Sequence, residues 1–429
     1  MHIRRVVLNN IKGFQTADLD FCPDGANYAG WAVVTGDNGS GKTALLRAIA
    51  LAILGPDQSR GLIPDLRGWV SHGVPAGTIS VEIHPDHKYD KTLKGGYPIQ
   101  STFWAEVEIG RDGGDAWDVR PADIFRNKKK SAVNGPWAQS TPGWSALAYG
   151  PFRRLYGSSP DAQRLMVLPG RIPRFATLFK EDATLAECEE WVRELQYKKL
   201  EGRETETATL ENLLALIGRD FLRHGVTVEK VDSEGIWLLD TAERRMPLID
   251  MSEGYRSALA MLIDIFRHMV EVYGPNILAH DADGRAYVDR PGVVLIDEID
   301  THLHPDWQRE IGFWLQEHFP DVQFIVTTHS PLVCPAATGG RIYHLPETLS
   351  DDERIEPFRL TTEDYERVLA GKPDQILISP AFGLAHTRSP RAVRAREKHA
   401  RLLSKRLSVG NLDDADQREL EQLELFVRD

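Results

Sequence analysis

The feature that most limits the possible folds is the glycine-rich run Gly36–Thr43, which reads Gly-Asp-Asn-Gly-Ser-Gly-Lys-Thr. The apolar stretch 31–35 before it predicts a buried strand. Residues 44–54 after it predict a helix, which the pair Gly55-Pro56 would end. Glycines at a strand-to-helix turn allow backbone N–H groups and the helix N-terminus to face phosphate oxygens. We therefore expect an α/β fold that holds nucleotide phosphates at this turn.

The residue types within this run match the chemistry of an ATP site. Lys42 is expected to reach the β and γ phosphates, and the Thr43 hydroxyl to ligate Mg²⁺. The other residues expected to surround the phosphates are Gly36, Asn38, Gly39, Ser40 and Gly41. The expected cofactors are ATP and Mg²⁺.

A second motif supplies carboxylates. The apolar run 293–296 ends in Asp297 and Glu298. Asp297 is expected to hold Mg²⁺ together with Thr43, and Glu298 to polarise the attacking water as general base. The strand predicted at 322–327 is followed by His329, which we expect to sense the γ-phosphate as a second catalytic residue. The simpler alternatives are a solvated strand end for the two acids and a structural role for the histidine.

A third motif, Ser252-Glu253-Gly254, precedes a predicted amphipathic helix with apolar residues spaced through 258–273. Such a helix offers a second N-terminus that can bind an anion. One nucleotide needs one phosphate cradle, so the second is expected to serve the nucleotide of a partner copy. The alternative is that Ser252 is an ordinary N-cap.

The order of these motifs resembles an ABC-type P-loop ATPase head of the branch that contains RecF, SMC and OLD proteins. The opening segment 3–14, the segment 297–305 and the run Thr-Thr-His-Ser-Pro-Leu at 327–332 carry the resemblance. It implies a mixed-sheet core with flanking helices and heads that pair around ATP. In such a pair Ser252, Glu253 and Gly254 would act in trans.

The resemblance also implies a role for Asp300, which would lie in the loop that crosses between the two heads. The glutamine that the family pattern places near Mg²⁺ has no clear equivalent. We expect its place within 148–154, with Gln163 as a weaker candidate.

The tail is similar to a narrower group. The segment 374–384, followed by a charged helical end, resembles compact bacterial anti-phage ATPases such as the PtuA component of Septu systems, which accompany HNH nucleases. This resemblance implies a regulatory ATPase that pairs with itself, as a homodimer or higher oligomer, and controls an HNH nuclease or another effector protein, with DNA or RNA as a further possible partner.

Three other functions are open to such a chain. The main alternative is a RecF-like DNA repair ATPase that acts directly on DNA. An OLD-type nuclease would need a further domain with an acidic triad, which is not evident after His329, so no nuclease site is expected in this chain. A transporter subunit would carry Pro-Thr after the acidic pair and a fuller signature.

The motifs suggest five segments. They are an N-terminal ATPase lobe (1–68), a strand-rich part of the head with a variable insertion (69–182), a short helical insertion (183–225), a C-terminal ATPase lobe (226–345) and a helical C-terminal extension for partner docking (346–429). Helices predicted at 183–200 and 206–224 are too short for the long arms of SMC proteins.

Charge is uneven along the chain. Residues 388–406 contain eight Lys or Arg and one acid, whereas acids dominate 413–429. This split predicts a self-paired helical hairpin, a docking surface or a contact to phosphates. A further basic run, 128–130, is expected to be a solvated loop.

Composition limits the remaining classes. With 429 residues and 42% hydrophobic content the chain can bury a large core. The net charge of −12 argues against a surface that binds nucleic acid everywhere. No long apolar stretch and no secretory pattern is evident, so we expect a cytoplasmic protein without membrane contact.

Overall fold

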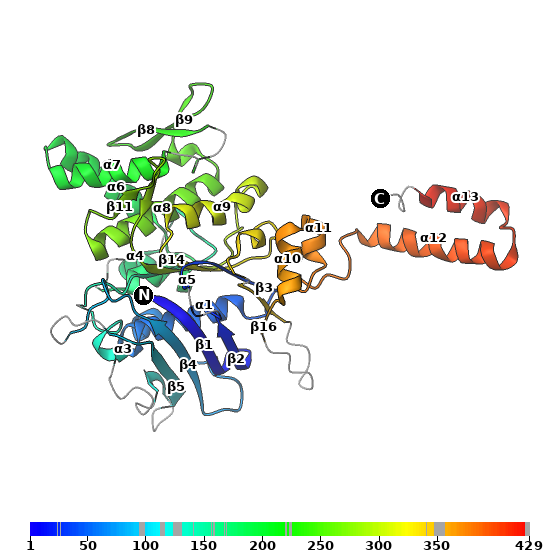
Figure 1. Ribbon diagram of the computed structural model, residues 1–429, viewed down its shortest axis with the longest axis horizontal. Helices are drawn as coiled ribbons and strands as arrows, with labels where there is room; N and C mark the ends of the chain where they lie inside the picture. Colours follow the sequence, from blue (N-terminus) through cyan, green and yellow to red (C-terminus); the bar gives the residue numbers. More distant parts are fainter. Residues whose placement is uncertain are drawn as a thin grey trace.

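The computed structural model describes residues 1–23, 25, 27–93, 99–111, 116–122, 131–139, 141–155, 157, 159–166, 168, 170–218, 221–222, 225–339, 341–346 and 357–424. The basic run 128–130 lies outside the described residues. Within them, strands form two large sheets and two small ones. Figure 1 shows the chain from blue at the N-terminus to red at the C-terminus.

One large sheet is antiparallel. Its strand order is β2 (Phe14–Asp20), β1 (His2–Ile11), β4 (Ala76–His84), β5 (Phe103–Arg111) and β6 (Trp117–Pro121). In β1 buried and more exposed residues largely alternate, as expected for a sheet with one face on the core. The buried face packs on α1 (Lys42–Leu54), which lies between the two large sheets.

The other large sheet is the centre of the molecule. Its order is β16 (Phe358–Arg359), β15 (Ile342–Leu345), β3 (Gly30–Gly36), β14 (Val322–Thr327), β13 (Gly292–Ile296) and β7 (Ala146–Tyr149), parallel except for β16. Both faces are covered: Trp31 and Val33 enter one core, whereas Ala32 and Val34 enter the other. Burial on both sides explains the uninterrupted apolar runs in the sequence.

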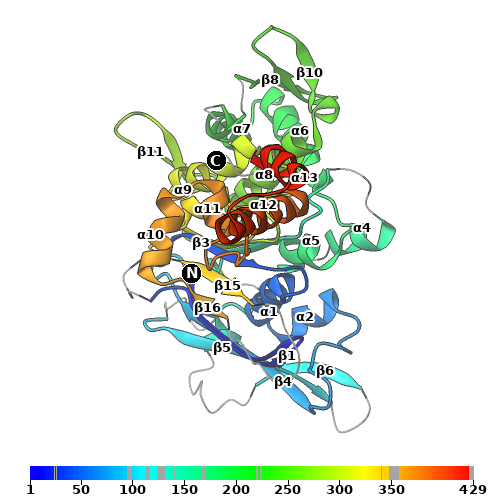
Figure 2. The ribbon, with the colours of Figure 1, turned by 90° about the vertical axis from the view of Figure 1, so that its right-hand side faces the viewer.

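Helices cover the second face of this sheet. The long ones are α8 (Glu253–Tyr273) and α9 (Pro305–His318). The predicted helical insertion is α6 (Ala186–Leu200) and α7 (Glu204–Ile217), which is next to the small sheet of β8 (Thr227–Asp232), β9 (Gly235–Leu239) and β10 (Arg245–Pro247). In Figures 1 and 2 this insertion lies at the top and the antiparallel sheet at the bottom.

One predicted boundary is wrong. The helix predicted at 206–224 is α7, which ends at Ile217, and the described residues Phe221 and Leu222 beyond it are not helical. The strand β10 is followed at once by the 3-10 turn η2 (Leu248–Asp250). The proline at 247 has no N–H to extend the strand pairing.

Short elements complete the described part of the chain. They are α2 (Pro56–Leu62), α3 (Ser131–Asn134), α4 (Pro160–Met166), η1 (Ile172–Phe175), α5 (Ala176–Phe179), β11 (Leu278–His280), β12 (Ala286–Val288), η3 (Cys334–Ala336), α10 (Thr362–Ala370) and α11 (Pro373–Leu377).

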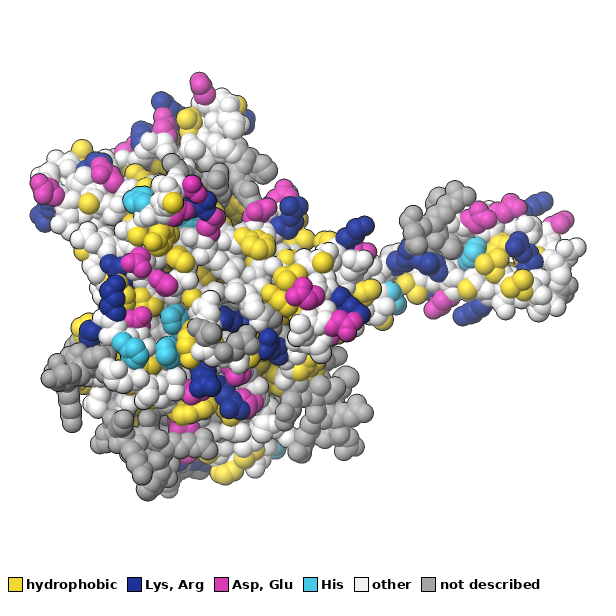
Figure 3. Space-filling view, viewed as in Figure 1, with side chains coloured by type: hydrophobic (Ala, Val, Ile, Leu, Met, Phe, Trp, Pro, Cys, Tyr) yellow, Lys and Arg dark blue, Asp and Glu magenta, His cyan; other side chains and the backbone are white. Residues whose placement is uncertain are grey.

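The C-terminal extension ends in a helical hairpin of α12 (Pro390–Val409) and α13 (Asp414–Leu423). It projects away from the body in Figure 1 and faces the viewer in Figure 2. Ion pairs Lys398–Glu419 and Lys405–Asp416 join its two helices. The space-filling view shows both basic and acidic side chains on it (Figure 3). Opposite charges therefore face each other in the hairpin, as the simplest interpretation of the sequence predicts, and Leu402 and Leu420 of its two helices are buried.

The α/β fold class predicted from the sequence is confirmed. The structure has a mixed sheet with flanking helices, a short helical insertion and a helical C-terminal extension. The carboxyl ends of β3, β7, β13 and β14 lie at one edge because these strands are parallel. Open α/β sheets bind ligands at that edge. Among the described residues, no helix combines the length and apolar character needed to cross a membrane.

Candidate active site

The glycine-rich run forms the turn between β3 and α1. Gly36 has φ 147°, and a Cβ there would lie 2.5 Å from the Leu345 carbonyl oxygen. Gly41 has φ 96°, and its Cβ would lie 2.7 Å from the ring of Phe14. Neither conformation nor space allows a side chain at these two positions. The sequence therefore needs glycine here to bring the turn to the N-terminus of α1.

Lys42 lies at the first position of α1 and its side chain folds back over the turn. It is buried, and its Nζ donates to the carbonyl oxygens of Gly36 and Asp37, both at 2.8 Å. Burial lowers the pKa of the ammonium, and the carboxylates of Asp297 and Glu298 oppose that shift. The cation therefore lies inside the loop, near the carboxylates at the end of β13.

Asp297 is fully buried and contacts two threonines. Thr43 Oγ1 donates to Asp297 Oδ2 at 2.7 Å, and Thr327 Oγ1 donates to Asp297 Oδ1 at 2.6 Å. The two expected Mg²⁺ ligands, Thr43 and Asp297, are therefore in contact. A hydroxyl and a carboxylate are hard oxygen donors, and Mg²⁺ usually takes only one or two protein oxygens besides phosphate and water. The donor set fits Mg²⁺.

Glu298 has a backbone conformation that few side chains adopt, with φ 44°. Its N–H donates to Thr327 Oγ1 at 2.8 Å, and its Oε2 accepts from Thr301 Oγ1 at 3.1 Å. Thr327 thus contacts both members of the acidic pair. A non-glycine residue with positive φ costs about 1–3 kcal/mol and often marks a functional site.

Asp300 contacts the segment after β14. Its Oδ1 accepts from Thr328 Oγ1 at 2.5 Å and from the His329 N–H at 3.3 Å. Gln308 Nε2 donates to the Asp300 carbonyl oxygen at 3.2 Å, and Ser330 Oγ donates to Gln308 Oε1 at 2.7 Å. The His329 side chain is exposed. Asp300 is expected in a loop between heads. Its hydrogen bonds also connect that loop to the segment that contains His329.

The segment expected to hold the missing glutamine contains a buried arginine instead. Arg153 donates to the carbonyl oxygens of Asp297 (2.8 Å) and Glu298 (3.1 Å). Gln163 is exposed on α4 and, within the described residues, makes no side-chain hydrogen bond to the site residues. Sequence reasoning assigned no role to Arg153 or Thr327. Thr327 is the polar last residue of the apolar strand β14, and Arg153 is the fourth residue after β7.

The signature residues lie at the N-terminus of α8. Ser252 occupies the N-cap position, but its hydroxyl makes no capping hydrogen bond and is exposed. Glu253 pairs with Arg256 at 2.6 Å. Gly254 is required because a Cβ there would lie 2.3 Å from the His302 carbonyl oxygen. A pocket of about 460 Å³ opens here, lined by Ser252, Gly254, Tyr255, His302, Leu303, His304, Asp306 and Trp307. No residue of the glycine-rich loop lines this pocket.

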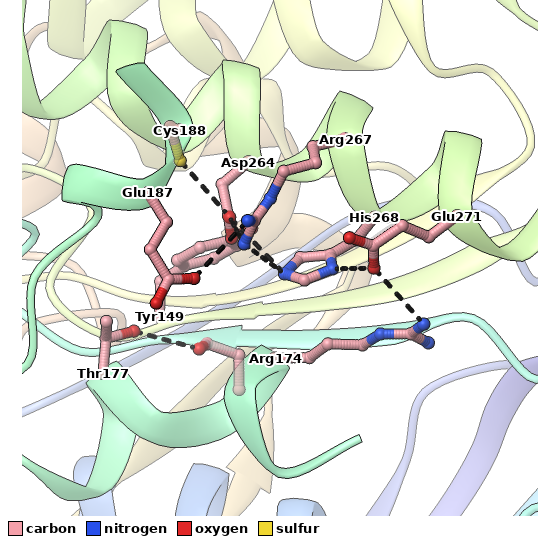
Figure 4. Close-up of polar contacts among 10 residues, drawn as sticks. Tyr149, Arg174, Thr177, Glu187, Cys188, Asp264, Arg267, His268 and Glu271 are labelled. Carbon is pink, nitrogen blue, oxygen red and sulfur yellow. Dashed lines mark hydrogen bonds and ion pairs between the residues drawn. The ribbon is translucent and has the colours of Figure 1, made fainter. Parts of the chain in front are cut away.

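Further along α8, a buried polar network joins this helix to the central sheet (Figure 4). Asp264 accepts from Tyr149 Oη of β7 at 2.8 Å, from Cys188 Sγ of α6 at 3.3 Å and from Arg267 at 3.0 Å. Burial raises the pKa of Asp264, but the positive charges of His268 and Arg267 outweigh it, so the pKa lies below its usual value. The other members, which extend the network to η1, are Glu187, His268, Glu271 and Arg174.

Comparisons with known proteins agree with this geometry. A family model described as "AAA domain, putative AbiEii toxin, Type IV TA system" matches residues 166–334, and one described as "AAA domain" matches residues 5–102. The chain is 25% identical to the Septu protein PtuA of Bacillus mycoides over 386 residues, which is 90% of this chain and 45% of that protein. Together with the geometry of the site, these similarities support an ABC-type ATPase.

Two further relatives match shorter segments of the chain. It is 38% identical to the Retron Ec83 probable ATPase of Escherichia coli over 25% of this chain and 18% of that protein. It is 29% identical to a Septu PtuA of Bacillus thuringiensis over 34% of each chain. In each of these alignments the chain spans less than half of the relative's own length.

Among solved structures, the chain resembles the SMC head bound to the C-terminal winged-helix domain of ScpA. That match has 15% identity and a TM-score of 0.45, and covers 86% of this chain and 100% of the other.

Proposed function

We propose that this ABC-type ATPase is a regulatory switch in which two copies close around two ATP molecules and control a separate effector, an HNH-type nuclease in an anti-phage complex. The contact of Thr43 with Asp297 carries the proposal. It brings the phosphate loop and the metal ligands to one sheet edge, where Glu298 follows directly. The signature residue Ser252 lines a different pocket, which supports a role toward a second copy.

Within one head the residues have separable tasks. The Lys42 ammonium would exchange its two carbonyl partners for phosphate oxygens. Thr43 and Asp297 would hold Mg²⁺, which neutralises charge on the phosphates when bound. The Glu298 carboxylate would take the proton of the attacking water, and the exposed His329 side chain is free to meet the γ-phosphate.

Between heads, we assign binding of the other copy's γ-phosphate to the N-terminus of α8. Its first N–H groups and the uncommitted Ser252 hydroxyl can donate to a γ-phosphate that the other copy binds. Because Gly254 packs directly against the His302 carbonyl, that N-terminus is held at the surface. Asp300 would then lie close to the interface between the two heads. Its carboxylate accepts a hydrogen bond from the backbone N–H of His329 in its own chain.

The relatives and the hairpin α12–α13 support the proposal that this protein controls an effector. Proteins named Septu PtuA and a retron ATPase are similar to this chain. The hairpin projects from the body and offers charged side chains of both signs (Figure 3). We assign it the role of docking the effector.

The experiment uses tagged Glu298→Gln protein purified from its native host in the presence of MgATP. Mass spectrometry and nucleic-acid absorbance identify what co-elutes, and a Lys42→Ala preparation serves as the ATP-independent control. A stoichiometric nuclease in the first preparation and its reduction in the second would support the switch. DNA without a protein partner, together with DNA-stimulated hydrolysis by the isolated chain, would favour a RecF-like ATPase that acts directly on DNA.

A further inference from the structure

Arg153 lies four residues after Tyr149, the fully buried last residue of β7, and is itself only 3% exposed. Its Nη1 donates to the carbonyl oxygens of Gly150 at 2.9 Å and Asp297 at 2.8 Å. Its Nη2 donates to the carbonyl oxygens of Glu298 at 3.1 Å and Ile299 at 3.4 Å. One guanidinium therefore holds three consecutive carbonyl groups of the loop that carries the acidic pair.

This loop needs such support because Glu298 has φ 44°. A backbone in that region persists only when its surroundings fix it. The N–H of Glu298 is fixed by Thr327, and its carbonyl, with those of its two neighbours, by Arg153. The planar fork of an arginine carries five N–H donors on three nitrogens, so it can reach acceptors that lie farther apart than the three donors on the one nitrogen of a lysine can reach.

Burying the charged Arg153 guanidinium also has a free-energy cost. Burial lowers its pKa to about 10, although the carboxylates of Asp297, Asp300 and Glu298 counteract the shift. Its hydrogen-bond partners are neutral carbonyls, and buried charges are weak contributors to stability. A purely structural task at this position could be met by a neutral donor.

We propose that Arg153 is a positioning residue for ATP hydrolysis, which sets the direction of the Glu298 carboxylate by fixing the backbone on both sides of it. The inference rests on the proposed function, in which Glu298 is the general base. Arg153 does not itself touch the reacting atoms. It acts from the segment where a glutamine was expected and not found.

The test compares Arg153→Lys with Arg171→Lys. Arg171 is a matched control: it is 5% exposed, burial lowers its pKa to about 10 as well, and it donates to the carbonyls of Pro136 and Thr141, away from the acidic pair. Single-turnover hydrolysis, the MgATP dissociation constant and the thermal midpoint are measured for both. Because misplacing a reacting group by about 1 Å can cost about 100-fold, Arg153→Lys should slow hydrolysis by about that factor. Binding of MgATP should stay within about threefold, since ground-state contacts are kept.

Arg171→Lys should lower the thermal midpoint by about as much as Arg153→Lys does. It should nevertheless hydrolyse ATP at the normal rate. The double variant Arg153→Lys/Glu298→Gln should be no slower than Glu298→Gln alone, because residues that act through one another are not additive. Normal hydrolysis by Arg153→Lys, an equal loss in Arg171→Lys, or an additive loss in the double variant would each overturn the proposal. If Arg153→Lys does not fold, Arg153→Gln, which buries no charge, replaces it with the same expected outcomes.

The role of Glu298 as general base and the role of Arg153 in positioning it can fail separately. If Glu298→Gln alone hydrolyses ATP normally, the proposed general base is wrong and Arg153 has nothing to position. If Glu298→Gln is inactive and Arg153→Lys is normal, only the positioning inference fails.

Discussion

Thr327→Val removes the hydroxyl that joins the acidic pair while keeping the shape of the side chain. In the native protein Thr327 Oγ1 donates to Asp297 Oδ1 at 2.6 Å and accepts from the Glu298 N–H at 2.8 Å. Thr327 and Asp297 are fully buried, so water cannot replace the lost partners. A hydrogen bond to a charged group contributes about 2 kcal/mol and a buried N–H without a partner costs about 2 kcal/mol. The free energy of unfolding should fall by about 4 kcal/mol.

Urea unfolding followed by circular dichroism measures this loss, with Thr327→Ser as the control that keeps the hydroxyl. Because Asp297 would then be held only by Thr43, affinity for MgATP should also fall by about tenfold, as is usual when the partner of a metal ligand is removed. A valine variant within about 1 kcal/mol of the native protein, with unchanged MgATP affinity, would refute the view that Thr327 organises this site.

Three further changes test other parts of the molecule. Lys42→Ala should abolish MgATP binding in calorimetry but leave the thermal midpoint without nucleotide nearly unchanged, because burial disfavours the ammonium that is removed; a large drop in that midpoint would contradict this. Asp264→Asn should destabilise the protein at pH 7 and progressively less as the pH falls below 3.8, the ordinary pKa, because a carboxyl whose folded pKa is lowered contributes stability that is lost as the pH falls from the ordinary pKa through the lowered one; an effect that does not change over this range in urea titrations would speak against it. Leu420→Asp, at a position 4% exposed in the hairpin, should speed limited proteolysis of α12 and α13 without altering MgATP affinity, and a change in that affinity would show that the hairpin and the site are coupled.

The central sheet was predictable because its strands are buried on both faces. The runs 31–35, 293–296 and 322–327 are almost wholly apolar, and each became a strand of the parallel core. The turn after the first of these strands was equally predictable from its glycines. In the structure Gly36 and Gly41 occupy positions that exclude a Cβ. At the end of α7 the predicted boundary was wrong, because residues 218–224 contain apolar side chains that the sequence pattern could not separate from the helix before them.

The candidate site was predictable where a motif is local and not where it depends on tertiary contact. Lys42 and Thr43 are adjacent to the glycines that identify them. Arg153 and Thr327 act through hydrogen bonds to residues that lie far away in sequence, with separations of 144 residues for Arg153 to Asp297 and 30 for Thr327 to Asp297. No periodicity or spacing encodes such pairs. Their burial next to carboxylates became visible only when the sheet was assembled.

The most direct test of the account is the mass of Glu298→Gln in solution, measured by light scattering with and without MgATP. Pairing of heads around ATP predicts the 48.2 kDa mass of one chain without nucleotide and twice that mass with it. Adding Ser252→Arg should leave the single-chain mass in both conditions, because the signature then cannot approach the partner's nucleotide. A mass that does not respond to MgATP, or a nucleotide-dependent dimer that forms equally well with Ser252→Arg, would contradict the central claim.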